Sequence, residues 1–380
     1  MSRQLKILLL GDTSNFQHTL AAGLRGFGHD VTVASDGTGW MNTARDIDLS
    51  RGDGKPGGAR LWYRMRYGSL APRLKGYDIV SLSGTHFARL QPALLTSIFD
   101  MVRRANKRVY MTALATDTNH ITECLDPDSP IAYNEWRVGN TPTPYAAEKG
   151  LIARAWLADP LRAYCRHLTD HIDGIVTALY EYHIAATRHS GLPASRIAYG
   201  GIPVDLDTIT FTPYAPAPDG RVRLFLGYPS ARMHEKGAER LLAAARQLAA
   251  DRPDLCTLDV ASDIPLADFR RRLDAAHVVI DQLYSYTPAT TALMAMAMGK
   301  TVITGAEDDY YRFIGEPTLR PIVNVVPDDR AIYETLLHVV STPGLLAERG
   351  RQGREFVERH NSATVVAGRY LTFWNHQPHP

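Results

Sequence analysis

Short hydrophobic runs and helical periodicities alternate along the whole chain. Residues 6–10 (Lys-Ile-Leu-Leu-Leu) form a short run that is apolar after its first residue and ends at Gly11, and an amphipathic helical pattern follows over 16–27 before Gly28. A second apolar run at 31–35 completes a strand–helix–strand unit. Because the first strand is continuously apolar from Ile7 to Leu10, the pattern predicts a parallel sheet that is covered on both faces.

Similar units recur in two series that flank a proline-rich stretch at 212–220, which we interpret as a linker. The first series has further strands at 77–82, 109–114, 172–177 and 196–199, and a helix at 94–106. The second has strands at 222–226, 256–261, 278–281, 301–304 and 322–326, and helices at 238–250, 267–275, 288–298, 330–341, 344–360 and 363–374. We therefore expect two doubly wound α/β domains that bind ligands in a cleft between them, at the carboxyl ends of their strands.

Composition excludes several classes of protein. The chain has 380 residues, of which 45% are hydrophobic and 22% charged, so disordered and fibrous classes are excluded. A net charge of +2 argues against a dedicated nucleic-acid binder. The three cysteines are widely spaced and odd in number, which favours buried thiols in a reducing compartment. With no signal peptide and no apolar run of about 18 to 20 residues, we expect a cytoplasmic protein, at most associated with a membrane surface.

Residues 51–75 are unusually basic and include Trp62, Tyr63 and Tyr67 between the positive charges. Two interpretations remain open. The segment is either a long loop followed by a solvated helix face, or a surface that contacts an anionic membrane or a lipid-phosphate acceptor.

A phosphate site is predicted in the loop 227–237, which directly follows the first strand of the second series and precedes a helix. Its candidates are Ser230, Arg232 and Lys236. An arginine can contact two phosphate oxygens at once and a lysine adds a point charge, which would stabilise a diphosphate leaving group.

A second phosphate site is predicted at the start of the helix 288–298. Thr287 followed by Pro288 is typical of a helix start, with a capping side chain and then a proline at the first helical position. The positive end of this helix would face the strand end, so Thr287 and the adjacent Tyr286 are further donor-site candidates.

These motifs resemble those of the family 4 glycosyltransferases, which are retaining enzymes of the GT-B fold. The resemblance rests on Gly28-His29-Asp30-Val31, on residues 201–205 (Gly-Ile-Pro-Val-Asp), on Lys236-Gly237 and on residues 295–304 (Ala-Met-Ala-Met-Gly-Lys-Thr-Val-Ile-Thr). It implies an N-terminal acceptor-binding Rossmann-like domain at 1–203 and a C-terminal nucleotide-sugar-binding domain at 204–355. Residues 356–380 would then cross back to the first domain.

The resemblance also implies an activity: transfer of a sugar from a nucleotide-sugar donor to a glycan or lipid-linked acceptor, with retention and without a metal ion or cofactor. The acceptor would meet Asp12 and Thr13 in the first loop and His86 after a later strand. Asp117 and His120 would orient or deprotonate the acceptor hydroxyl as catalytic residues. His167 and His171 have a spacing that suits zinc, but no third ligand follows at a suitable distance along the sequence, so we expect no metal site.

One departure from the family pattern leaves alternatives open. Where the family has two glutamates seven residues apart, one for the sugar and one for the ribose, this sequence aligns Tyr286 and Met294. A methionine is a poor acceptor for ribose hydroxyls. Glu307, Asp308 or Glu316 would then substitute, the donor would sit differently, or catalysis would be lost.

Two other functions are therefore kept as alternatives: a non-catalytic GT-B relative that binds a sugar nucleotide or a partner, and a GT-B sugar-nucleotide epimerase. A Rossmann dehydrogenase is disfavoured, because the first loop reads Gly-Asp-Thr-Ser-Asn and lacks the glycines that a dinucleotide requires.

Overall fold

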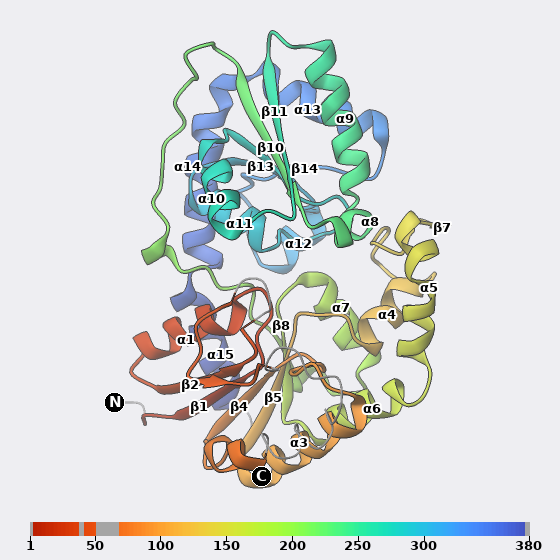
Figure 1. Cartoon of the computed structure of the whole chain (residues 1–380), viewed down its shortest axis with the longest axis vertical. Helices are drawn as coiled ribbons and strands as arrows, with labels where there is room; N and C mark the ends of the chain where they lie inside the picture. Colours follow the sequence, from red (N-terminus) through yellow and green to blue (C-terminus); the bar gives the residue numbers. More distant parts are fainter. Residues whose placement is uncertain (1–2, 38–41, 51–67, 377–380) are drawn as a thin grey trace. The chain divides into compact units, whose positions relative to one another are not determined.

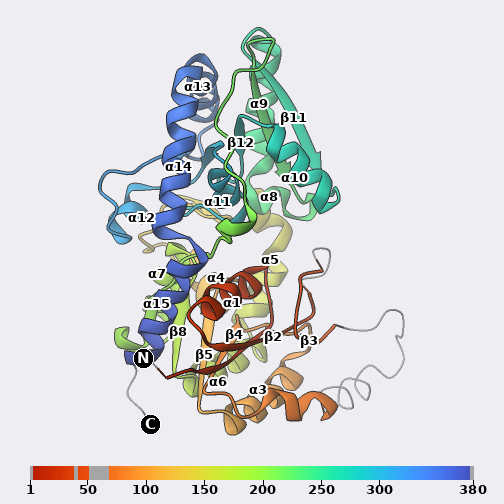
Figure 2. The ribbon, with the colours of Figure 1, turned by 90° about the vertical axis from the view of Figure 1, so that its left-hand side faces the viewer.

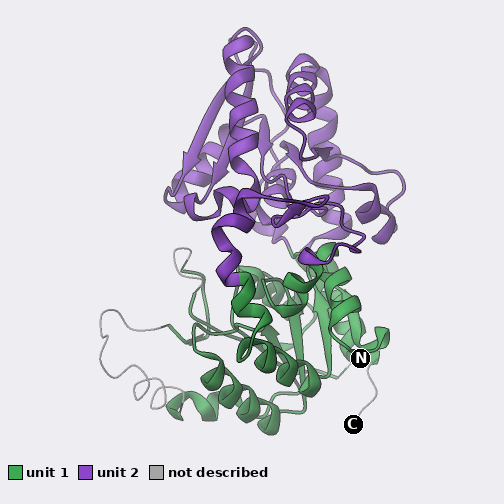
Figure 3. Cartoon of the chain, turned by 90° about the vertical axis from the view of Figure 1, so that its right-hand side faces the viewer, with its two compact units in different colours: residues 1–123, 153–203, 363–380 green, residues 124–152, 204–362 purple. Residues whose placement is uncertain are grey.

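The chain separates into two compact units (Figure 3). The computed structural model describes residues 3–37, 42–50 and 68–376, so most of the basic segment, at 51–67, lies outside the described residues. The first unit comprises residues 1–123, 153–203 and 363–380, and the second comprises 124–152 and 204–362. Residues 124–152, which the sequence interpretation placed in the first domain, thus belong to the second unit. Within the described ranges, no helix combines the length and the apolar character needed to cross a bilayer.

The first unit is built on a parallel seven-stranded sheet in the order β3-β2-β1-β4-β5-β8-β9 (Figure 1). Its strands are β1 (Lys6–Leu10), β2 (Asp30–Ser35), β3 (Ile47–Asp48), β4 (Ile79–Ser83), β5 (Arg108–Ala113), β8 (Gly174–Thr177) and β9 (Ile197–Tyr199). Its helices are α1 (Phe16–Gly26), α3 (Pro92–Ala105), α4 (Thr118–Leu125), α6 (Leu161–His171), α7 (Tyr180–His189) and α15 (Ala363–His376). The chain passes between the units through the end of α4, through α5 (Pro144–Leu157), and again at residues 203 and 362.

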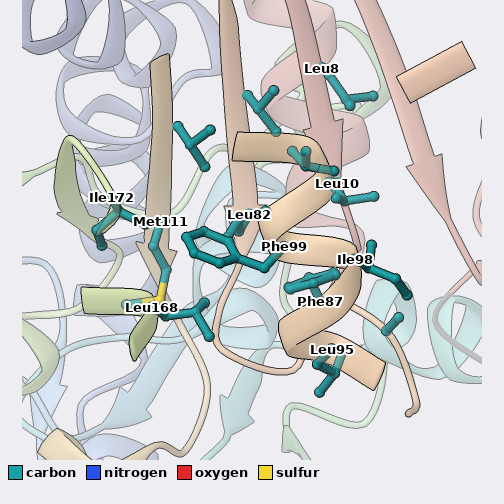
Figure 4. Packing of buried hydrophobic residues seen from close by; sticks show 14 of the residues in the cluster. Leu8, Leu10, Leu82, Phe87, Leu95, Ile98, Phe99, Met111, Leu168 and Ile172 are labelled. Atoms are coloured by element: carbon teal, nitrogen blue, oxygen red, sulfur yellow. The ribbon is translucent and has the colours of Figure 1, made fainter. Parts of the chain in front are cut away.

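Both faces of this sheet are covered, as the apolar first strand predicted. On one face, strand residues pack against α3 and α6 in a cluster that Figure 4 shows from close by and that includes Leu8, Leu10, Leu82, Leu95, Phe99, Met111 and Leu168. On the other face, the hydroxyls of Thr112 and Tyr370 lie 3.2 Å apart and bring α15 onto the sheet. Helices α1 and α15 lie side by side (Figure 2), and a Cβ at Gly23 would overlap the carbonyl group of Ala363.

The second unit has a parallel five-stranded sheet in the order β11-β10-β12-β13-β14. Its strands are β10 (Val222–Tyr228), β11 (Cys256–Ser262), β12 (Val278–Ile280), β13 (Thr301–Thr304) and β14 (Val323–Asn324), and a small hairpin pairs β6 (Arg137–Val138) with β7 (Thr141–Pro142). Its helices are α8 (Met233–Lys236), α9 (Ala238–Asp251), α10 (Leu266–Ala275), α11 (Thr290–Ala297), α12 (Asp308–Phe313), α13 (Asp329–Ser341) and α14 (Leu346–His360). Two doubly wound parallel sheets confirm the predicted fold class.

Each sheet has a point at which the strand order reverses. In the first unit, β1 pairs with β2 on one side and with β4 on the other. In the second unit, β10 pairs with β11 on one side and with β12 on the other. Such reversal points leave a crevice at the carboxyl ends of the strands, which is where ligands of open α/β sheets bind. A ligand site is therefore expected at these two edges, where the sequence-predicted residues should lie.

All three cysteines, Cys124, Cys165 and Cys256, are buried free thiols, as the composition predicted.

Candidate functional site

The carboxyl edge of the second sheet holds a buried ion pair at its reversal point. Lys236 ends α8 in the loop after β10, and Asp281 directly follows β12. The Nζ atom of Lys236 lies 2.6 Å from Oδ1 of Asp281, and the two side chains are 9% and 0% exposed. The other oxygen of Asp281, Oδ2, is buried and has no partner among the described residues. The lysine predicted for phosphate is thus at the expected edge, but its charge is already balanced by a carboxylate.

The turn that carries Lys236 is held firmly against the loop after β12. The carbonyl of Lys236 accepts a hydrogen bond of 2.8 Å from the backbone N–H of Leu283. Gly237 adopts a left-handed conformation with φ of 63°, and a Cβ there would lie 2.8 Å from Cβ of Leu283. Only glycine enters this conformation without strain and leaves room for so close an approach. The backbone therefore fixes where the base of the Lys236 side chain lies.

Ser230 and Arg232 lie on the exposed part of the same loop. The backbone N–H of Ser230 donates to Oδ1 of Asp263 at 3.1 Å, and these contacts with Ser230 lower the pKa of Asp263. Arg232 contacts Glu235 through two hydrogen bonds of 2.9 and 2.6 Å. Because Arg232 is exposed, this pair is worth little in stability and can rearrange around an anionic ligand.

The predicted start of the second phosphate helix is wrong. Helix α11 begins at Thr290 with Ala289 as its N-cap, so Thr287 does not cap it and Pro288 is not its first residue. Thr287 is only 2% exposed, and its carbonyl accepts a hydrogen bond from the Ser285 hydroxyl. The segment 285–287 instead packs on Gly305, where a Cβ would overlap the Ser285 carbonyl.

Tyr286 is covered by residues from the segment 124–152, which we call the strap. Tyr286 is 4% exposed, and its hydroxyl accepts a hydrogen bond of 2.8 Å from the backbone N–H of Ala132. The ring of Tyr133 lies 4.9 Å from the Tyr286 ring, and the Tyr133 hydroxyl donates to Glu307 at 2.5 Å. The strap also reaches the phosphate loop, where Nδ1 of His234 lies 3.0 Å from a carboxylate oxygen of Glu148. It therefore lies along the same edge as the candidate residues.

The three acidic substitutes considered for the missing glutamate all have partners. Glu307 accepts from Tyr133 and from Asn324, and Asp308 forms an ion pair with Arg320. Glu316 is 3% exposed and is bound by residues of α14. Each carboxylate is thus committed to a structural contact in this unit.

A carboxylate that sequence reasoning missed lies in the first turn of α9. Both side-chain oxygens of Glu239 are buried without a hydrogen-bond partner among the described residues, and burial raises the pKa of this carboxyl. It follows Lys236 by three residues, and Tyr284, whose pKa it helps to raise, is among its neighbours. The sequence shows this carboxylate only as an acidic residue in the first turn of a helix that follows Gly237. Such a residue is also expected simply because it stabilises the positive end of the helix dipole.

At the carboxyl edge of the first sheet, the candidates converge on the reversal point. The hydroxyls of Thr13, after β1, and Ser83, at the end of β4, lie 3.3 Å apart. Asp12 accepts from the backbone N–H of Gln17 at 2.9 Å and from the Thr43 hydroxyl at 3.1 Å, and burial raises its pKa. Asp12 therefore holds the first turn of α1 in place.

Gln17 adds an unsatisfied group to this unit. Its side chain is 0% exposed, and neither its amide nitrogen nor its amide oxygen has a partner among the described residues. The contacts of the described residues leave both of its polar atoms unpaired, and no pattern in the sequence singles out this glutamine.

Asp117 and His120 lie together after β5. Asp117 is 6% exposed, and its Oδ1 accepts from the backbone N–H of His120 at 2.8 Å, so it caps α4. Burial raises the pKa of Asp117, which moves it toward the range useful to a general base. The His120 ring lies 4.5 Å from that of Tyr182. His86, after the neighbouring strand β4, is exposed, with its ring 4.9 Å from that of Trp156.

Comparison with known proteins gives structural matches alone, since no family model and no curated protein matches the sequence. HepE from Anabaena, in complex with UDP and glucose, is 11% identical with a TM-score of 0.60, over 98% of this chain and all of that one. Sucrose-phosphate synthase from Thermosynechococcus elongatus is 16% identical with a TM-score of 0.58, over 98% of both chains.

A third structure is provisionally described as a UDP-N-acetylglucosamine 2-epimerase from Listeria monocytogenes; it is 12% identical with a TM-score of 0.54, over 100% of this chain and 98% of that one. HepE and sucrose-phosphate synthase are GT-B glycosyltransferases. The likeness shows that this chain has the GT-B fold with two Rossmann-like units, as predicted.

Proposed function

We propose that this chain is a glycosyltransferase that transfers a sugar from a nucleotide-sugar donor to a glycan or lipid-linked acceptor. The observation that carries the proposal is the position of Lys236 at the reversal point of the second sheet, in a chain of GT-B fold. A buried lysine at this edge is placed to stabilise the charge that develops on a diphosphate leaving group. The binding of UDP and glucose by HepE supports the same assignment.

In this proposal the second unit binds the donor. Lys236 exchanges Asp281 for the diphosphate, while Ser230 and Arg232 supply further donors from the exposed loop. The side chain of Glu239 rotates out of its buried position and accepts hydrogen bonds from hydroxyl groups of the donor. It thereby replaces the family's second glutamate, whose position is occupied here by Met294. Tyr286 and Thr287 contribute by shaping the loop after β12.

The first unit is proposed to bind the acceptor. Asp12, Thr13 and His86 contact or flank the acceptor, and Asp117 with His120 takes or orients the proton of its hydroxyl. Retention of configuration and activity without a metal ion are part of the proposal, as are a cytoplasmic location and a role in glycan synthesis.

The test is a calorimetric titration against UDP, GDP, ADP and CMP sugars. We expect one donor to bind, and Arg232→Ala to weaken that binding by about five- to tenfold, since one charged contact with phosphate is lost. Arg252→Ala is the matched control, because Arg252 is an exposed arginine of the same unit that pairs with Asp254. Silence of the wild-type chain across the panel would contradict the proposal.

Two observations favour a second candidate, a non-catalytic relative that binds a sugar nucleotide or a partner. The charge of Lys236 is balanced by Asp281, and the Tyr286 hydroxyl already accepts a hydrogen bond from the backbone of the strap. Donor binding without transfer to any glycan acceptor would support this candidate. Product analysis of the donor incubated alone separates transfer from epimerisation.

Glu239→Gln is expected to stabilise the protein and to weaken donor binding. Removing an unpaired buried charge should raise the free energy of unfolding by about 1 kcal/mol at neutral pH. Since burial raises the folded-state pKa, the wild-type carboxyl stabilises the fold most at acid pH and loses that contribution as the pH rises through the folded pKa. The gain from glutamine should therefore grow between about pH 4 and pH 7.

Thermal unfolding over this pH range, with titration of the donor identified above, checks both effects. Glu334→Gln, on an exposed helix face, should change neither. If Glu239→Gln stabilises the protein but leaves donor affinity unchanged, Glu239 carries an unpaired buried charge but does not bind the donor.

A further inference from the structure

The amino edge of the first sheet carries a cavity that the proposed function does not use. It has a volume of about 920 Å³ and lies where β1, β4 and β5 begin, at the opposite edge of the sheet from Asp12 and Asp117. The residue after α1, Phe27, and the α15 residues Gly368 and Leu371 complete its wall. A cavity of this size suits a small organic ligand.

Positive charge is in excess in this cavity. Arg3 and Lys107 share one carboxylate, Asp78, whose Oδ1 lies 3.3 Å and 2.6 Å from their nitrogens. Oδ2 of Asp78 also accepts from the backbone N–H of Lys6 at 3.0 Å. Although burial acts to raise it, these hydrogen bonds hold the pKa of Asp78 below its ordinary value. The single carboxylate of Asp78 therefore pairs with two cations and one backbone N–H, and it neutralises only one of the two positive charges.

Arg108 is the third cation of the wall, and it is buried. It is 8% exposed, and it also lines a second, adjoining cavity of about 360 Å³. Its Nη1 donates to the carbonyl of Trp374 in the last turn of α15. Among the described residues, no carboxylate lies within ion-pair distance of its guanidinium, which offers five N–H donors. The contact with a helix end balances part of its charge and leaves donor capacity for an anion.

The side of the cavity formed by α1 and α15 carries the apolar groups Phe27, Gly368 and Leu371 beside the polar Thr372, Asn375 and His376. Phe27, which lines the cavity, is 47% exposed. Gly368 of α15 faces it, since a Cβ there would lie 3.8 Å from Cζ of Phe27 and would meet no other atom. His29 is not a cation here, because burial lowers its pKa and its Nδ1 accepts from the backbone N–H of Leu5.

We propose that this cavity binds a phosphate group attached to an apolar chain, with the phosphate at Arg108 and Lys107 and the chain along Phe27 and Gly368. The ligand is either a single-chain phosphate free in solution or the headgroup region of an anionic lipid, because both present this chemistry. The site lies in the first unit alone and does not depend on the proposed transferase activity.

The experiment measures binding of decyl phosphate, below its micelle concentration, and of phosphatidylcholine vesicles that contain phosphatidic acid. Lys107→Ala should weaken binding at least fivefold. Gly368→Leu should weaken it at least tenfold by filling the apolar side, while it favours helix in α15 and therefore preserves the fold. Arg330→Ala, an exposed arginine outside the cavity, is the control and should bind as wild type.

Inorganic phosphate separates the two halves of the site, since its weak binding should respond to Lys107→Ala and not to Gly368→Leu. Binding of free decyl phosphate identifies a soluble single-chain ligand, and binding of the vesicles alone identifies a membrane lipid. Absence of binding in both arms overturns the proposal, as does an affinity that neither variant changes. Donor titrations should be the same in all these variants, so the outcome is independent of the proposed function.

Discussion

Lys236→Ala is expected to lower the free energy of unfolding of the second unit by about 3–5 kcal/mol, because it leaves a buried carboxylate without its ion-pair partner. Asp281 is 0% exposed, and its one ionic contact within the described part of the chain is the 2.6 Å pair with Lys236. Its Oδ2 has no partner among the described residues, so both oxygens would be buried without a donor once the lysine is gone. Chemical denaturation followed by a probe in the second unit measures the loss.

Donor binding should also disappear in Lys236→Ala, but that result alone cannot separate a lost phosphate contact from a partly unfolded unit. The double variant Lys236→Met with Asp281→Val resolves this. Replacing a buried ion pair by apolar groups of similar size is often neutral or stabilising, so stability should return to within about 1 kcal/mol of wild type. Donor affinity should stay at least tenfold lower.

Either of two results would contradict this account of Lys236. Wild-type donor affinity in the stable double variant would show that the lysine is a structural residue and not a phosphate ligand. A single variant as stable as wild type would show that the ion pair is not needed to hold Asp281. Arg252→Ala serves as the control, because its solvent-exposed pair with Asp254 should contribute little to stability.

The parallel sheets were predictable because several central strands are short, largely apolar runs that are closed by glycine or a polar turn. Residues 6–10 and 222–226 are of this kind, and the structure has β1 and the core of β10 there. A strand buried on both faces shows no alternation of polar residues, so it stands out from the amphipathic helices between strands. The switch points then follow from the fold, and they place Lys236 correctly at a strand end.

The helices between β5 and β8 were missed for a different reason. Helix α6 buries Tyr164, Cys165 and Leu168, which have helical spacing, so its signal was present in the sequence. Helix α5 buries only Ala153 and leaves Leu151 74% exposed. Its sequence therefore carries no clear amphipathic pattern from which a helix could be predicted.

Local rules also misplaced the start of α11. A threonine before a proline is a common helix start, yet Ser285 packs closely on Gly305 and the helix begins only after Ala289, whose backbone is extended. Tertiary contact overrode the local preference. The partners of the candidate residues were equally hidden, because Asp281 meets Lys236, and Ala132 meets Tyr286, across long separations in the sequence.

Glu316→Gln is expected to destabilise the second unit by about 2–4 kcal/mol, since it breaks a buried network. Glu316 accepts from Arg359 at 2.9 Å and from the backbone N–H of Leu319 at 2.9 Å, and His360 lies 2.8 Å away. Arg359 and His360 end α14, so the carboxylate fastens this helix to the loop after α12. A glutamine would turn an amide N–H₂ toward donors. Glu358→Gln, in an exposed pair with Arg354, is the control and should cost less than about 0.5 kcal/mol.

The same carboxylate should make the second unit sensitive to acid. Although burial acts to raise it, the hydrogen bonds from His360, Leu319, Thr318 and Arg359 lower the pKa of Glu316 to about 2. A depressed folded-state pKa gives stability that is complete above the unfolded value of 4.5 and is lost as the pH falls toward 2. Because solvent screens the half-exposed Arg359, we expect this contribution to be about 1–3 kcal/mol. Denaturation at pH 7, 5 and 3.5 should therefore show the wild type and Glu316→Gln converging at acid pH, and parallel curves would mean that the network is held by packing and not by this charge.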